Sequence, residues 1–126
     1  MSDEPRRPRD YQDLLVWKKG MALAKQIYQL TGTFPDTEKF GLVSQMRRAA
    51  VSIPSNIAEG QARNTTGEFI QFLSHAEGSV AELDTQLILS TGLGYCSQAE
   101  ASDARGIVLE LRKMLSALRI KLSKAS

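Results

Sequence analysis

The chain has little of what most enzyme and metal sites need. Its 126 residues include one histidine, His75, and one cysteine, Cys96. A single cysteine excludes an internal disulfide and fits a reduced cytosol. A single histidine excludes the paired Glu-x-x-His motifs that hold a di-iron centre in a helical bundle. Gly92-x-Gly94 lacks the third glycine and the preceding strand of a dinucleotide-binding loop. We therefore expect no catalytic residues, no metal and no cofactor.

Long apolar runs and a targeting segment are also missing. The first ten residues, MSDEPRRPRD, contain no apolar stretch of the kind that signal peptides carry. No run of about 18 apolar residues occurs, so the sequence predicts no membrane span. These absences favour the cytoplasm. Residues 1–10 are expected to form a disordered, solvated tail; a phosphate contact by its Arg6-Arg7-x-Arg9 cluster is the alternative.

No segment alternates polar and apolar residues with the period of a β-strand. From Tyr11 onward, apolar residues recur at steps of three and four, which is the period of an amphipathic helix. The four stripes are Leu14, Trp17, Met21, Ala24 and Tyr28; Val43, Met46, Ala50, Ile53 and Ile57; Phe69, Phe72, Ala76, Val80, Leu83 and Leu87; and Val108, Leu111, Leu115, Leu118 and Leu122. The sequence therefore predicts an all-α fold over residues 11–126, an antiparallel up-down-up-down four-helix bundle.

Capping residues and breakers mark the helix starts. The TFPDTE segment, with Pro35, separates the first two stripes. Thr65-x-x-Glu68 and Ser97-x-x-Glu100 are capping boxes, in which a hydroxyl and a carboxylate satisfy the free N–H groups of a first turn. They predict the starts of the third and fourth helices.

Three glycines are predicted to have structural roles, two of them at helix ends and one at a close contact between helices. Gly60 is expected to end the second helix, and Gly92 to adopt the left-handed conformation after the third. Gly78 lies inside the third helix, where glycine costs roughly 1 kcal/mol relative to alanine. We expect it to face the second helix or a neighbouring subunit, with Ser79 or His75 contributing a hydrogen bond. The alternative is a merely tolerated glycine.

The second helix contains a proline. Pro54 lacks the N–H that would bond to the carbonyl of Ala50. The apolar period nevertheless continues beyond it to Ile57. The sequence therefore predicts a helix from near Lys39 to near Glu59 that bends at Pro54 without ending.

Polar side chains form a line on the same helix. They are Ser44, Arg48, Ser52, Asn56, Glu59 and Arg63. An ordinary solvated face would more often carry lysine and glutamate. We favour a built-in polar network, within or between subunits, that includes Ser44, Ser52, Asn56 and Glu59, with Glu59 contributing to stability. A ligand or nucleic-acid contact and an idle solvated face are the alternatives.

Charge is low overall but uneven. A formal net charge of +2 does not by itself predict a nucleic-acid partner, and the third helix carries acidic residues without lysine or arginine. The candidate nucleic-acid-binding residues are Arg47, Arg48, Arg63, Lys18 and Lys19, with Arg47 and Arg63 expected to be the more available cations.

The alternative for the basic residues is pairing with acids inside the bundle. Arg105, Arg112 and Arg119 recur every seven residues on the fourth helix, and Glu77 and Asp84 are seven residues apart on the third. A hairpin folded about residues 93–95 would place Asp84 opposite Arg105, and Glu77 opposite Arg112.

The first helix is apolar on more than one face. Besides its stripe it carries Val16, Leu23, Ile27 and Leu30. A helix that is apolar most of the way round is buried on two sides, whereas each helix of a four-helix monomer faces water. We therefore predict a homo-oligomer; a thick core stripe with scattered exposed aliphatic residues is the alternative.

Several segments resemble a known family. LLVWKKGMALA, FPDTEKFGLVSQMRRAAVSIPSNIAEGQAR, FIQFLSHAEGSVAELDTQLIL and LGY resemble the small four-helix-bundle family encoded within intervening sequences of bacterial large-subunit ribosomal RNA genes. The resemblance covers about residues 11–122 and is most specific over residues 34–63. The family is in turn similar to the accessory variability determinant of diversity-generating retroelements, a barrel-shaped homopentamer that works with a reverse transcriptase and binds nucleic acid through basic residues.

The resemblance implies a bundle fold, a homopentamer, and work alongside a reverse transcriptase or another nucleic-acid enzyme. We accordingly expect a non-enzymatic accessory or scaffold protein in RNA or DNA handling, with weak nucleic-acid binding by a basic patch. The alternative is a protein-interaction or assembly module without nucleic-acid affinity.

Overall fold

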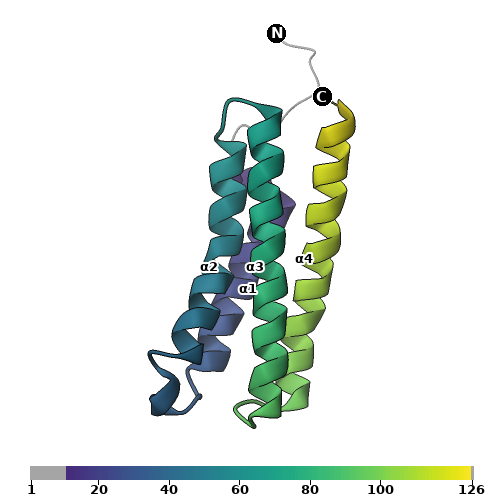
Figure 1. Ribbon diagram of the computed structural model, residues 1–126. Coiled ribbons are helices and arrows are strands. Elements are labelled where there is room, and N and C mark those ends of the chain that lie inside the picture. Colours follow the sequence, from purple (N-terminus) through teal and green to yellow (C-terminus); the bar gives the residue numbers. More distant parts are fainter. Residues whose placement is uncertain (1–10, 126) are drawn as a thin grey trace.

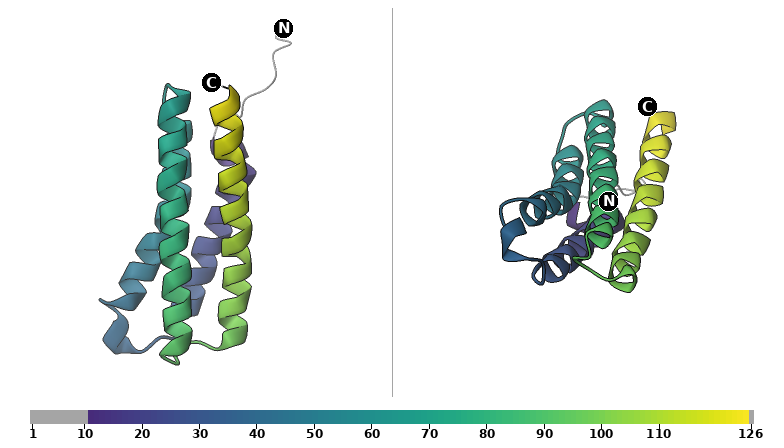
Figure 2. Two further views of the ribbon diagram at one scale, coloured as in Figure 1. Left: turned by 45° about the vertical axis from the view of Figure 1, so that its right-hand side comes forward. Right: turned by 60° about the horizontal axis from the view of Figure 1, so that its bottom comes forward.

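Four long helices make up the molecule. The computed structural model describes residues 11–125. The elements are η1 (Tyr11–Asp13), α1 (Leu15–Thr31), η2 (Asp36–Glu38), α2 (Leu42–Gln61), α3 (Thr66–Gly92) and α4 (Gln98–Ala125). Each helix packs against the next along the chain, and α4 packs against α1, which closes the bundle (Figures 1 and 2). The predicted all-α up-down bundle is confirmed. The predicted tail, residues 1–10, lies outside the described residues.

The core runs along the bundle axis. Its largest fully buried side chains are Leu23 and Ile27 of α1; Met46, Ile53 and Ile57 of α2; Leu73, Val80, Leu83 and Leu87 of α3; and Val108, Leu111 and Leu115 of α4. All four helices contribute aliphatic side chains at helical spacing, so the apolar periodicity is satisfied by mutual burial.

The face of α1 that packs into the core is not the one that the sequence suggested. Its buried residues include Val16, Leu23, Ile27 and Leu30, the set predicted to lie outside the main stripe. In the predicted stripe, Trp17 and Met21 are only half-buried and Tyr28 is 46% exposed. Periodicity alone cannot decide between two adjacent stripes, because both have the helical spacing.

Helix α2 continues through Pro54, as predicted. It begins at Leu42 and not near Lys39, because η2 and the non-helical backbone of Gly41 (φ −109°, ψ −112°) separate residues 36–41 from it. Pro54 is buried against α1 at Gly20, where a Cβ atom would lie 3.4 Å from Pro54 Cδ. In Figure 1 the first turns of α2 lean away from α3, whereas its last turns run beside α3.

The predicted capping residues begin both helices, but only the second forms a complete capping box. Glu68 N donates to Thr65 Oγ1 (3.2 Å), and the Thr65 hydroxyl, not its N–H, donates to Glu68 Oε1 (2.9 Å). At the start of α4 the exchange is reciprocal: Glu100 N donates to Ser97 Oγ (3.1 Å) and Ser97 N donates to Glu100 Oε1 (3.0 Å). Hydrogen bonds from the Ser97 N–H, and then from the Ser97 side chain, to the carboxylate lower the pKa of Glu100.

The end of α3 corrects the prediction for Gly92. Gly92 is the last residue of the helix, and Gly94 is the residue with a left-handed backbone (φ 78°). Tyr95 N donates to Ser90 O (2.9 Å) and Gly94 N donates to Thr91 O (3.0 Å). This pair of bonds is the Schellman motif, with Gly94 in the position that requires a positive φ.

Two other glycines differ from their predicted roles within the chain. Gly60 lies in the last turn of α2, one residue before the helix ends at Gln61; it is buried there, and an added Cβ would lie 2.6 Å from Phe72 Cβ of α3. Gly78 does not contact the second helix, since nothing lies within 4 Å of an added Cβ; its contact with a neighbouring subunit stays a prediction. The neighbouring Ser79 does contact α2, since its Oγ lies 2.6 Å from Ser52 Oγ. The close approach between α2 and α3 is therefore at Gly60 and not at Gly78.

Ion pairs join α3 to α4. The predicted pair of Asp84 and Arg105 is confirmed (2.7 Å), whereas Glu77 pairs with Arg119 (2.7 Å) and not with Arg112. Arg112 and Arg119 are seven residues apart and share one flank of α4, so the heptad spacing alone could not decide which of them pairs with Glu77.

Candidate functional site

An open furrow runs between α1 and α2. Its upper stretch, about 680 Å³, is lined by Tyr11, Trp17, Met21, Lys25, Pro54 and Ala58, among others. Its lower stretch, about 690 Å³, is lined by Val43 and by Lys39, Phe40, Ser44, Arg47, Arg48 and Ser52. Tyr28, Val51 and Ser55 line both stretches, which are therefore continuous.

The two stretches differ in character. Aromatic and aliphatic side chains such as Trp17, Met21 and Val51 dominate the upper stretch, where Lys25 is the only charged lining residue within residues 11–125. Lys39, Arg47 and Arg48 supply three positive charges to the lower stretch. In the described part of the chain, no aspartate or glutamate lines either stretch. The lower stretch is thus suited to an anion and the upper stretch to an apolar surface.

Arg47 is fixed against the end of α1. Its Nε donates to Thr31 Oγ1 (3.0 Å), its Nη2 donates to Tyr28 O (3.3 Å), and its guanidinium carbon lies 4.5 Å from the centroid of the Tyr28 ring. The C-terminal turn of a helix carries free carbonyls and partial negative charge, which favour a cation there. Arg47 is therefore not the freely available cation that the sequence suggested.

Arg48 and Lys39 are the more accessible cations. Arg48 is exposed, and within residues 11–125 it has no ion pair within 4.0 Å and no side-chain hydrogen bond. Lys39 is exposed, with its Nζ 5.6 Å from the centroid of the Phe40 ring. Lys39 was not among the cations predicted from the sequence. Its place beside an aromatic residue and a glycine, Phe40 and Gly41, was the one feature that could have indicated an exposed turn with a binding role.

The other predicted cations lie elsewhere. The end of α2 at Gln61 lies about 20 Å along the helix from Arg48, and Arg63 follows that end, where it pairs with Glu59 (3.2 Å). Lys19 forms an ion pair with Glu110 of α4 (2.9 Å). Lys18 is exposed on α1. Only Arg47 and Arg48 of the five candidates share one groove.

The predicted polar stripe divides into separate contacts. Ser52 Oγ lies 2.7 Å from Ala49 O, in addition to its contact with Ser79, and Asn56 Nδ2 donates to Ser52 O (2.7 Å). Ser44 instead lines the lower stretch of the furrow. These contacts connect Ser52 and Asn56, but they do not include Ser44 or Glu59.

Glu59 contributes less to the stability of the fold than the predicted polar network required. Its side chain is 57% exposed, and it pairs with Arg63, four residues further on and just beyond the end of α2. Exposed pairs of this spacing contribute about 0.3–0.5 kcal/mol. Phe72 also lies against Arg63, whose guanidinium carbon is 4.8 Å from the ring centroid. Arg63 therefore packs across the α2–α3 contact as well as pairing with Glu59.

A carboxylate that was not predicted from the sequence joins two connections at one end of the bundle, the one before α2 and the one between α3 and α4. Glu38 Oε1 accepts from Leu42 N (3.1 Å) at the start of α2, and Glu38 Oε2 accepts from the Tyr95 hydroxyl (2.8 Å). The Tyr95 ring packs against Phe34 at 5.5 Å. The backbone N–H, then the Tyr95 hydroxyl, lower the pKa of Glu38, and the same carboxylate raises the pKa of Tyr95.

This contact predicts an acid-sensitive stability. Because the pKa of Glu38 is lower in the folded chain, its ionised form stabilises the fold above its unfolded pKa, and that contribution is lost as pH falls through the folded pKa. Thermal unfolding of the parent and of Glu38→Gln should therefore converge between about pH 7 and pH 3. If the difference in Tm between the two proteins is the same at both pH values, the ionised carboxylate is not the stabilising group.

The matched residues identify the family. The family model described as 23S rRNA-intervening sequence protein matches residues 12–117 of the chain. The chain belongs to this family. A solved structure from Bacteroides thetaiotaomicron, a protein with unknown function from the S23 ribosomal protein family, is similar with a TM-score of 0.76 and 22% identity. The match covers 83% of this chain and 98% of that one. No curated protein matches the chain.

These findings establish the family and the fold of this intervening-sequence protein. At 22% identity the solved structure shows the bundle fold alone. The likeness to the retroelement accessory determinant remains a prediction. Within residues 11–125, no helix is long and apolar enough to cross a membrane, and no three His, Cys, Asp or Glu side chains are grouped so that they could hold a metal.

Proposed function

We propose that this intervening-sequence protein is a non-enzymatic, homo-oligomeric accessory or scaffold protein in RNA or DNA handling, which binds nucleic acid weakly through the lower stretch of the furrow. The observation that supports this most directly is the grouping of Lys39, Arg47 and Arg48 in one groove that no carboxylate lines among the described residues.

The donors of the lower stretch suit phosphate. Arg47 uses two of the five N–H donors of its guanidinium on Thr31 and Tyr28, which leaves three. Arg48 has all five guanidinium donors available in the described structure. Arginine matches phosphate oxygens with two parallel hydrogen bonds. The net charge of +2 limits long-range attraction, so one copy is expected to bind weakly.

Assembly would compensate for weak binding by one copy. The upper stretch leaves Trp17, Met21 and Val51 incompletely covered, and such a surface supports the prediction of a homo-oligomer. The resemblance described above favours a pentamer. In any closed ring the basic groove repeats once per subunit, and several weak contacts along one strand multiply the apparent affinity.

An accessory role is favoured over catalysis. Roughly 25 Å along α3 separates His75 from the loop that carries Cys96, and His75 packs edge-on against Phe72 at 5.9 Å. A cysteine nucleophile needs a base within hydrogen-bond reach. The chemistry would therefore belong to the partner, which the resemblance suggests is a reverse transcriptase or another nucleic-acid enzyme.

A charge-matched pair of variants tests the assignment of the groove. Arg48→Ala should weaken binding of labelled RNA or DNA and reduce the slope of log affinity against log salt by about 1, as expected for one lost phosphate contact. Arg112→Ala is the control, since Arg112 is an exposed arginine of α4 without an ion pair in the described structure. Titrations by fluorescence anisotropy at several salt concentrations measure both quantities. Equal slopes for the two variants would place the binding surface elsewhere.

The second candidate function is an assembly module without nucleic-acid affinity. The apolar upper stretch favours it, because that stretch suits a protein surface and not a polyanion. The same titration separates the two functions. A parent protein that binds neither RNA nor DNA at low salt, while forming a stable oligomer, supports the assembly module.

A further inference from the structure

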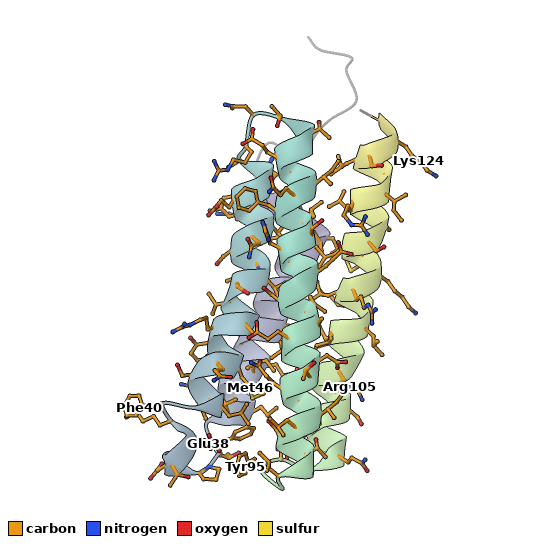
Figure 3. All side chains as sticks on the ribbon, viewed as in Figure 1. Glu38, Phe40, Met46, Tyr95, Arg105 and Lys124 are labelled. Carbon is orange, nitrogen blue, oxygen red and sulfur yellow. The ribbon has the colours of Figure 1, made fainter. Side chains whose placement is uncertain are left out.

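Phe40 is the most exposed large hydrophobic residue in the described structure. Its side chain is 90% exposed, whereas Phe34, six residues earlier, is buried beside Tyr95. Figure 3 shows Phe40 projecting away from the bundle, while Glu38 and Tyr95 meet at the bundle end. The core at this end is thus filled without Phe40, and the ring is left in water.

Hydrogen bonds of the neighbouring residues order the backbone that carries Phe40. Gly41 N donates to Glu38 O (3.0 Å), and Leu42 N donates to the Glu38 carboxylate. Lys39 N donates to Asp36 O (3.1 Å). The residues on both sides of Phe40 are therefore bonded into η2 and the start of α2. The exposed ring is carried by an ordered turn, so little backbone conformational entropy would be lost when a ligand packs on it.

The ring borders the basic groove. Phe40 and Tyr28 line the lower stretch together with Lys39, Arg47 and Arg48. The Arg47 guanidinium lies over the Tyr28 ring, 4.5 Å from its centroid. Lys39 Nζ lies 5.6 Å from the Phe40 centroid, but at 90% exposure Phe40 still has an open ring face. An open aromatic face beside guanidinium groups complements a ligand that carries both a planar base and a phosphate.

We propose that the lower stretch binds single-stranded RNA or DNA, with one base stacked on the Phe40 ring and the adjoining phosphate on Arg48 and Arg47. This inference rests on the proposed function and narrows its ligand to single strands. In a duplex each base face is already covered by its neighbours, whereas an unpaired base can leave the strand and stack on an aromatic side chain.

A second copy of the chain is a poorer occupant for this stretch. A subunit docked on Phe40 would cover the guanidinium of Arg48, and a buried charge without a partner is costly. The upper stretch offers apolar contact at a smaller cost, since Lys25 is its one charged lining residue in the described part of the chain, whereas three charged residues line the lower stretch. The lower stretch therefore stays open to solvent when subunits associate through the upper stretch.

Three substitutions of Phe40 distinguish stacking from general apolar contact. Phe40→Trp keeps an aromatic face, Phe40→Leu keeps apolar volume without one, and Phe40→Ala removes both. Leu15→Ala is the control, because Leu15 is 68% exposed and lies outside the lining of the furrow. The probes are labelled oligouridylate, oligothymidylate and an RNA duplex of equal length, titrated at constant salt, with the oligomer mass of each variant measured by light scattering.

We expect a loss of affinity for single strands and not for the duplex. Phe40→Ala and Phe40→Leu should bind both single strands about ten-fold more weakly, in the range found for removal of one stacked base. Phe40→Trp and Leu15→Ala should bind like the parent, and duplex affinity and oligomer mass should not change in any variant.

Other outcomes overturn the inference in distinguishable ways. If the parent binds nucleic acid and Phe40→Ala binds single strands equally well, the proposed function stands and stacking on Phe40 is wrong. If Phe40→Ala lowers the oligomer mass, Phe40 is a subunit contact. If the parent binds none of the three probes, the proposed nucleic-acid function fails together with the inference.

Discussion

Replacing Gly60 with alanine should lower the free energy of unfolding by about 2–3 kcal/mol, in spite of the better helix propensity of alanine. The new Cβ would lie 2.6 Å from Phe72 Cβ, 3.0 Å from Phe69 Cδ1 and 3.3 Å from Phe69 O. A Cβ atom and a carbonyl oxygen cannot rotate away, so α2 and α3 would have to separate. The contact between these helices is extensive, and the shift would loosen the packing of Phe69 and its neighbours.

Gly78→Ala is the matched control for this prediction. Gly78 is also a helix-interior glycine, but an added Cβ there meets nothing within 4 Å. Alanine should therefore stabilise the helix by up to about 1 kcal/mol. Thermal and chemical unfolding of both variants at one fixed protein concentration would show opposite shifts. Equal stabilisation by the two alanines would mean that the helices can separate at Gly60 without cost.

The contrast between these glycines shows what the sequence could and could not predict. Both are glycines within a helix, and the close contact with the second helix or a neighbouring subunit was predicted at Gly78. The side chain that makes a glycine necessary lies on another helix, at Phe72, and depends on how far the two helices slide past each other. Periodicity and capping residues are local, so the four helices and the starts of α3 and α4 were predictable from them.

The candidate site was predictable only in part for the same reason. Arg47 and Arg48 were both identified, but neighbouring helix positions point in different directions, and the crossing of α1 over α2 decides that Arg47 binds Thr31 while Arg48 faces water. The exposure of Phe40 was also unpredictable, because Phe34 has the same chemistry and could equally have been the exposed ring. Only the packing of Phe34 against Tyr95 separates them.

Introducing a charge at Met21 should dissociate the proposed homo-oligomer without unfolding the subunit. Met21 lines the upper stretch of the furrow together with Val51 and Pro54, and it does not line the lower stretch. In the isolated subunit Met21 is half-buried and the furrow is open, so the carboxylate of Met21→Glu can reach water. In an assembly that covers this stretch the carboxylate would be buried without a partner, which costs several kcal/mol. A cost of about 3 kcal/mol weakens association roughly a hundred-fold.

Light scattering and helical circular dichroism measured on the same samples test this prediction. The parent should have a mass several times the 13.9 kDa of one chain, and Met21→Glu should approach 13.9 kDa with unchanged helical content. Leu15→Glu is the control: it adds the same charge on the same helix, at a residue that is 68% exposed and outside the furrow, and its mass should equal that of the parent. If Met21→Glu retains the parental mass, the subunits associate through another face. If the parent itself has the mass of one chain at all concentrations, the half-covered face of α1 is an ordinary monomer surface, and the furrow is left free along its whole length for a ligand.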